Sequence, residues 1–117
     1  MLSVRLKAIA DCVPEGTIVA DIGTDHAFLP VELIASGKIE RAYACDIGTG
    51  PLEHARATVA EAGLQAQISL ILTPGLEKVP QDAQVAVNIS LCALEAFFLA
   101  SRQLLQRCGS FWKPLSA

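Results

Sequence analysis

The sequence of 117 residues contains few aromatic residues and no long apolar run. Aromatic residues make up only 5% of it while 52% is hydrophobic, so the apolar content is mostly Ala, Leu, Val and Ile. That composition suits strands covered on both faces. No stretch approaches the roughly 20 apolar residues that a membrane span needs, and no signal-peptide pattern is visible. We therefore expect one cytoplasmic domain over residues 1–117.

Two functional classes are disfavoured by what else the sequence lacks. Its four cysteines are widely spaced, none belongs to a CxxC pair, and no histidine stands near two of them, so no metal site is expected. Cys12, Cys45, Cys92 and Cys108 are instead expected to be buried free thiols. The net charge of −3 and the nine dispersed basic residues do not make the basic face of a strong nucleic-acid binder.

Apolar runs alternate with helix-like stretches along most of the chain. Such alternation predicts βαβ units and a Rossmann-like, doubly wound, mostly parallel α/β sheet of about four to five strands. Strands are expected over 17–22, 41–47, 66–72 and 84–91, with the stub of a fifth at 109–115. Helices are expected over 3–13, 27–36, 51–62 and 94–108, with Ser3 capping the first and Gly37 and Gly63 ending the next two.

Two acids stand at the ends of neighbouring predicted strands. Asp21 lies near the end of the first strand and Asp46 near the end of the second, about twenty residues beyond Gly23, where nucleotide-binding folds place an acid for ribose hydroxyls. Gly23 lets the backbone turn tightly and approach a ligand. Either acid alone is also typical of a helix cap. Because the two acids occur together on one βαβ unit, we interpret them as a site for a nucleotide-like ligand.

The turn after the first strand narrows the choice of nucleotide. It has only the first glycine of the G-x-G-x-x-G pattern, and Asp25 would repel a pyrophosphate, so a nicotinamide-dependent oxidoreductase is the weaker alternative. S-adenosylmethionine carries adenosine without phosphates, and its cationic sulfonium and ammonium groups favour nearby carboxylates. A hydrolase is disfavoured because no G-x-S-x-G motif occurs.

Three segments carry a family resemblance: "LSVRLKAIA", "VADIGTDHAFLP" and "CDIGTGPLEHA". With them, the first 65 residues or so resemble the bacterial tRNA (adenine-N1)-methyltransferase family that modifies adenine 22, a class I S-adenosylmethionine-dependent group. The resemblance implies the class I methyltransferase fold, S-adenosylmethionine as cofactor, tRNA as partner, and a cytoplasmic enzyme that methylates N1 of adenine. It implies no metal and no membrane.

The resemblance also implies roles for individual residues. Cofactor-binding residues would be Asp21, Ile22 and Gly23 near the methionine part, Asp46 at the ribose, Ile47 against the adenine, and Pro51 and Gly75 in the turns that follow. Asp25 would assist at the target adenine, because a nearby carboxylate can take the proton that becomes acidic on N1-methylation. His26 would position Asp25, or would simply pack or cap the next helix. His54 is expected on the surface.

The second half departs from the family pattern. Pro74 stands where the family has the acid of a "GDGL" turn, and the stretch after the fourth strand lacks the family's glycines. The later strands and the helical C-terminal domain of the family are missing. We therefore expect a truncated cofactor-binding domain capable of self-association through its open sheet edge. The alternative is an inactive module of the same fold that binds a nucleoside cofactor or a protein.

Overall fold

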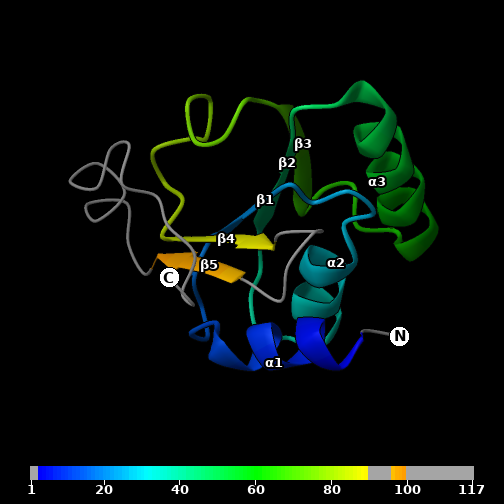
Figure 1. The fold of residues 1–117 in the computed structure, drawn as a ribbon. Coiled ribbons are helices and arrows are strands. Elements are labelled where there is room, and N and C mark those ends of the chain that lie inside the picture. Colours follow the sequence, from blue (N-terminus) through cyan, green and yellow to red (C-terminus); the bar gives the residue numbers. More distant parts are fainter. Residues whose placement is uncertain (1–2, 90–95, 100–117) are drawn as a thin grey trace.

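The computed structural model describes residues 3–89 and 96–99, which form three helices and five strands (Figure 1). The helices are α1 (Val4–Cys12), α2 (Phe28–Ala35) and α3 (Thr49–Ala62). The strands are β1 (Val19–Ile22), β2 (Ala42–Asp46), β3 (Ile68–Leu72), β4 (Val85–Ile89) and β5 (Ala96–Leu99). None of the helices in the described ranges is long and apolar enough to cross a membrane.

The five strands form one sheet in the order β3-β2-β1-β4-β5. The first four are parallel, with Val19 of β1 paired with Ala42 of β2 on one side and with Val85 of β4 on the other. The order therefore reverses between β1 and β4, as the predicted doubly wound α/β fold requires. In open α/β sheets, ligands bind beside such a reversal, outside the carboxyl ends of the strands.

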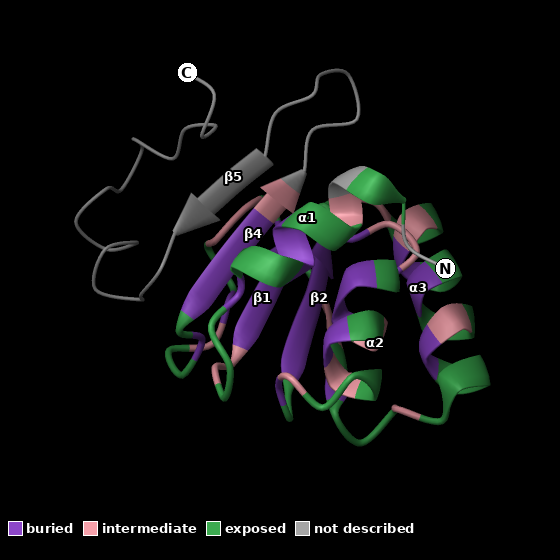
Figure 2. Cartoon of the chain, turned by 90° about the horizontal axis from the view of Figure 1, so that it is seen from below, coloured by how far each residue is buried: buried purple, intermediate pink, exposed green. Residues whose placement is uncertain are grey.

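The three helices cover one face of the sheet (Figure 2). Leu33 of α2 and Val59 of α3 pack against strand residues such as Val19, Ala44 and Val87 in one buried cluster. The connections β1-α2-β2 and β2-α3-β3 step across the sheet in the same direction. Because such crossovers are right-handed, both place their helix on the same face.

The connection from β3 to β4 runs back across the sheet and covers the opposite face. Val79 and Ala83 of this segment pack against Ala20 and Tyr43 in a second buried cluster. The Tyr43 hydroxyl also donates a hydrogen bond to Asp82 at 2.6 Å, which ties the segment to β2. This face is therefore covered by an irregular segment, because residues 73–84 contain three turn-forming positions, Pro74, Gly75 and Pro80.

The predicted helix boundaries are confirmed where the sequence carried a capping signal. The Ser3 hydroxyl accepts a hydrogen bond from the Leu6 amide at 3.2 Å and caps α1. Gly37 and Gly63 follow α2 and α3 with positive φ angles of 79° and 70°, a conformation that glycine adopts without strain. Only the start of α3 differs, because it begins at Thr49 rather than at Pro51.

The predicted helix over 94–108 is wrong at residues 96–99, which form β5. This strand pairs antiparallel with β4, and Phe98 lies opposite Val87. Aromatic side chains favour strands, and an edge of β4 was available for pairing, so sheet formation overrode the helical spacing. The rest of that predicted helix and the predicted strand stub at 109–115 lie outside the described residues.

The expectation of buried cysteines is right for Cys45 and wrong for Cys12. Cys12 ends α1 and is exposed, whereas Cys45 is buried within β2, and both are free thiols. Burial, together with the charges of Asp21 and Asp46, raises the pKa of the Cys45 thiol to about 12. Cys45 is therefore an unreactive core residue. Cys92 and Cys108 lie outside the described residues.

Candidate functional site

The carboxyl ends of β1 and β2 bring Asp21 and Asp46 to the same edge of the sheet. Asp21 pairs with Ala44 of β2 in the parallel register, and Asp46 is the last residue of that strand. Both acids are buried, at 4% and 9% exposed. Two buried carboxylates at neighbouring strand ends concentrate acidic groups at this edge of the sheet, which suits a cationic ligand.

Asp21 occupies the drier of the two environments. Its carboxylate accepts a hydrogen bond from the Thr24 hydroxyl at 2.8 Å, which favours the charged form. Burial works against that form and dominates, and the charge of Asp46 adds to it, so the pKa of Asp21 rises to about 7. The Asp21 carboxyl is thus poised to change its charge near neutral pH.

Asp46 forms hydrogen bonds with the backbone of the turns that follow β1 and β2. One carboxylate oxygen accepts from the Asp25 amide at 3.1 Å, and the other accepts from the Gly48 amide at 3.1 Å. A carboxylate has about four acceptor positions. Asp46 therefore keeps the capacity to accept two further hydrogen bonds, the number that a vicinal diol donates.

Gly23 turns the chain at the point where the strand order reverses. Its φ of +71° lies in the left-handed region. A Cβ at this position would lie 3.3 Å from the side-chain oxygen of Asn88, which stands opposite Ile22 near the end of β4. The left-handed backbone conformation of residue 23 and the close approach of the Asn88 side chain thus both require glycine at this position.

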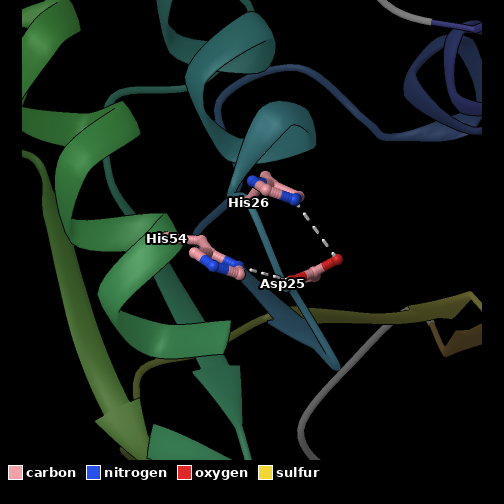
Figure 3. A group of neighbouring side chains, drawn as sticks. All are labelled: Asp25, His26 and His54. Carbon is pink, nitrogen blue, oxygen red and sulfur yellow. Dashed lines mark ion pairs between the residues drawn. The ribbon is translucent and has the colours of Figure 1, made fainter. Parts of the chain in front are cut away.

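Asp25 meets two imidazoles at this edge (Figure 3). One of its carboxylate oxygens lies 3.6 Å from Nε2 of His26 and the other 3.5 Å from Nδ1 of His54. Asp25 and Ala27 both have positive φ angles, 53° and 59°. Such conformations are strained for residues with a side chain and occur most often at functional sites. The strained loop holds Asp25 half-buried, with its carboxylate turned toward α3.

The two imidazoles stack on each other. Their ring centroids are 4.7 Å apart with planes 5° from parallel, and His26 also stacks on Phe28. The donor atoms of Asp25, His26 and His54 lie within 4.8 Å of one another, which is close enough to hold a metal ion. However, each nitrogen lone pair lies in the plane of its ring, so two parallel stacked rings cannot both direct one at the same ion. The observed arrangement is one of stacked rings rather than a chelate.

The remaining predicted cofactor residues lie around Asp46, with one exception. Ile47 follows β2 with 74% of its surface exposed. Pro51 lies beside Gly48, where an added Cβ would meet its ring at 2.9 Å. Gly75 is linked to Asp46 through Thr73, whose amide donates to the Asp46 carbonyl at 2.9 Å and whose hydroxyl donates to the Gly75 carbonyl at 3.3 Å. Ile22 is the exception, because its side chain is buried in the second core cluster.

The sequence did not indicate that His54 contacts Asp25 or that Thr24 and Thr73 are buried at the site. His54 is exposed, as expected of a surface residue, yet it reaches Asp25. It lies one turn into α3. A helix that follows a parallel strand starts at the carboxyl edge of the sheet, so the position of His54 near the start of α3 could have indicated that it lies at this edge. Thr24 and Thr73 are buried and bond within the turns, which nothing in their sequence context indicates.

Exposed apolar side chains gather at the same edge. Of the four large hydrophobic residues that are exposed in the described part of the chain, Phe28 follows β1, Ile47 follows β2 and Leu72 ends β3. The fourth, Val4, lies on α1. Exposed apolar surface beside polar groups is typical of binding sites. The carboxyl edge thus combines carboxylates for polar contacts with apolar side chains for a flat ring.

Comparison with known proteins gives consistent matches. A family profile described as "Methyltransferase domain" matches residues 2–93. The tRNA (adenine(22)-N(1))-methyltransferase of Bacillus subtilis strain 168 is 37% identical over 89 residues, which are 76% of this chain and 37% of that protein.

Solved structures of related enzymes show the same fold. The B. subtilis m1A22 tRNA methyltransferase TrmK has a TM-score of 0.71 at 28% identity, over 75% of this chain and 50% of that one. M. capricolum TrmK, solved with S-adenosyl-homocysteine, has a TM-score of 0.69 at 30% identity, over 94% and 58%. This chain therefore spans little more than a third of the curated relative and about half of each solved chain.

Proposed function

Because this chain belongs to the methyltransferase domain family, we propose that it binds S-adenosylmethionine and transfers the methyl group to N1 of an adenine in tRNA. The observation that carries the proposal is the pair of buried carboxylates, Asp21 and Asp46, at the ends of β1 and β2, next to the reversal of strand order between β1 and β4. The identity to the tRNA (adenine(22)-N(1))-methyltransferase of B. subtilis supports the choice of substrate.

The residues at the strand ends fit the cofactor. Asp46 has two acceptor positions left for the ribose hydroxyls after its bonds to the Asp25 and Gly48 amides. Ile47, exposed beside it, offers an apolar surface for the adenine. Asp21 stabilises the cationic methionine part through its charge, since ionisation of its carboxyl is favoured when a cation lies nearby. Gly23, Pro51 and Gly75 shape the turns around the cofactor, and Ile22 contributes through its backbone, since its side chain is buried.

Asp25 is suited to the acceptor adenine. Its carboxylate is 38% exposed and held by a strained turn, so it is accessible and oriented. S-adenosylmethionine supplies an electrophilic methyl group. As N1 of adenine bonds to that methyl, the C–S bond breaks and the exocyclic amine becomes more acidic. Asp25 accepts a hydrogen bond from this amine and takes its proton, while His26, at 3.6 Å, positions the carboxylate.

The partners follow from the proposed substrate. A tRNA substrate implies action in the cytoplasm, and with a net charge of −3 this chain alone is expected to bind tRNA weakly. Self-association through a sheet edge is a separate expectation, which sedimentation of the purified chain tests directly. A single species at the mass of one chain would contradict it.

Methyl transfer tests the proposed function. The chain is incubated with tRNA transcripts and S-adenosylmethionine carrying a labelled methyl group, and the product is mapped by arrest of reverse transcription at N1-methyladenine. We expect label at one adenine, with at least a hundredfold loss in Asp25→Asn, since general acid–base groups contribute about 10²–10⁴-fold. Cofactor binding without any transfer would contradict the proposal and favour the inactive binding module.

A further inference from the structure

Three exposed rings lie nearly parallel beside the proposed catalytic carboxylate. His26 stacks on His54 at a centroid distance of 4.7 Å and on Phe28 at 5.0 Å, with planes within 8°. His54 comes from α3, Phe28 is the first residue of α2, and His26 lies in the turn before α2. Their side chains are each about half exposed: 44% for His26, 59% for His54 and 48% for Phe28.

Such rings suit a flat ligand. Burial of an apolar ring is favourable. Phe28 nevertheless lies outside both described core clusters and stacks on the His26 imidazole instead. Aromatic and imidazole faces are the surfaces on which proteins stack unpaired RNA bases. Because His26 already stacks on both other rings, a base would stack on the half-exposed rings of His54 or Phe28 and extend the existing stack.

The carboxylate beside the rings restricts what the ligand can be. Asp25 lies 3.6 Å from His26 and 3.5 Å from His54, so a group that stacks on these imidazoles comes next to a negative charge. That charge repels a phosphate and a uracil carbonyl, whereas it accepts a hydrogen bond from an exocyclic amine. The chemistry favours an adenine base over the RNA backbone.

We infer that His26, His54 and Phe28 form a stacking platform that holds the methyl-accepting adenine, with its amine edge toward Asp25. The inference rests on the proposed function, since it assigns the acceptor base of that reaction to these rings. In the proposed function the cofactor's own adenine lies beside Ile47 and Asp46, so the platform is left for the acceptor base. The platform thus accounts for the exposed Phe28 and His54, which cofactor binding leaves without a role.

The two histidines make the platform directly observable, because they are the only ones in the sequence. The chain is first saturated with S-adenosyl-homocysteine, then titrated with adenosine while the imidazole C–H signals are followed by NMR. His54→Phe assigns the two signals. We expect adenosine at millimolar concentration to shift both signals upfield through its ring current, and uridine to shift them much less. Histidine signals that respond to the cofactor product but not to adenosine would overturn the platform.

Substitutions separate stacking from other roles. Phe28→Ala and His54→Ala are expected to weaken adenosine binding about tenfold, in line with the usual strength of base–aromatic stacking. His54→Phe keeps a stacking ring and should retain the affinity. Val4→Ala removes an exposed apolar side chain on α1, outside the three rings, and serves as the control. If His54→Phe behaves like His54→Ala, the imidazole acts through its nitrogens and the inference is wrong.

Cofactor binding by the same variants distinguishes the two proposals. Calorimetry should give unchanged affinity for S-adenosyl-homocysteine in Phe28→Ala and His54→Ala. A large loss of that affinity would assign the rings to the cofactor and overturn the inference. Absence of cofactor binding in the unsubstituted chain would instead overturn the proposed function, while the adenosine titration, then run without S-adenosyl-homocysteine, still reports on the platform.

Discussion

At the residue scale, the site depends on a few positions where backbone and side chain are constrained together. Gly23 must have a positive φ and must also leave room for Asn88. The sequence indicated Gly23, Asp21 and Asp46, because their chemistry is local to a strand end. It could not indicate that Asn88 approaches Gly23 or that His54 approaches Asp25, since both contacts depend on how distant elements pack.

Replacing Gly23 by alanine tests both constraints. The left-handed backbone costs a residue with a side chain about 1 kcal/mol, and contact with Asn88 adds to it. Gly63→Ala is the matched control, because its φ of +70° is the same and a Cβ there meets nothing within 4 Å. Urea unfolding should show a loss of about 1 kcal/mol in Gly63→Ala and about 2 kcal/mol in Gly23→Ala. Equal losses would mean that Asn88 moves aside freely.

Asp21 gives the protein a specific pH dependence. Its pKa of about 7 in the folded chain lies above the ordinary aspartate value of 3.8, so between about pH 4 and 7 the folded state holds a proton that the unfolded state releases. Its contribution to stability is therefore fully present below pH 4 and is lost as the pH rises through 7.

The Asn variant isolates this effect. Asp21→Asn stays neutral and can still accept from the Thr24 hydroxyl, so relative to it the parent chain should lose roughly a few kcal/mol of unfolding free energy between pH 4 and 8. Urea unfolding of both chains across that range measures the difference. A difference that does not vary with pH would show that Asp21 is charged throughout.

At the element scale, the capping signals predicted the start of α1 and the ends of α2 and α3, because a cap acts within a few residues. The start of α3 differs, at Thr49 and not at Pro51. Residues 96–99 show the limit of that reasoning. Their helical spacing is local, whereas pairing with β4 is a long-range contact that no short pattern contains. The predicted parallel sheet is confirmed for β1 to β4. This long-range feature was predictable because the alternation of strands and helices along the sequence itself indicates a parallel sheet.

The end of α1 offers a test at this scale. The Lys38 ammonium donates to the Ala10 and Asp11 carbonyls at 2.8 and 3.2 Å at the end of the helix. The Ala10 carbonyl also accepts from the Val13 amide, so Lys38 gives it a second donor and gives the Asp11 carbonyl a partner at the helix terminus. Lys38→Met keeps the apolar stem and removes both bonds. We expect a loss of about 1 kcal/mol in urea unfolding.

Lys7→Met is the control for that substitution. It makes the same charge change on the exposed side of α1 and should alter the unfolding free energy by less than about 0.5 kcal/mol. Equal effects of the two substitutions would show that net charge, and not capping by Lys38, determines the result.

At the scale of the whole molecule, the two faces of the sheet are covered differently, and the strand order reverses at the site. Helices cover one face, the segment between β3 and β4 covers the other, and the reversal between β1 and β4 opens the carboxyl edge to a ligand. That edge collects the buried carboxylates, the strained turn and most of the exposed apolar residues. The two carboxylates at neighbouring strand ends were predictable from the sequence because they follow strands, whereas the stacked rings were not, because they come from a turn and two different helices.

Calorimetric titration with S-adenosyl-homocysteine shows whether the carboxyl edge holds the cofactor. We expect micromolar binding by the unsubstituted chain, loss of binding in Asp46→Ala, and unchanged binding in Glu61→Ala, which removes an exposed carboxylate from the far end of α3. Circular dichroism confirms that each variant is folded. A folded chain that does not bind, or an Asp46→Ala variant that binds as tightly as its parent, would contradict the assignment of this edge to the cofactor.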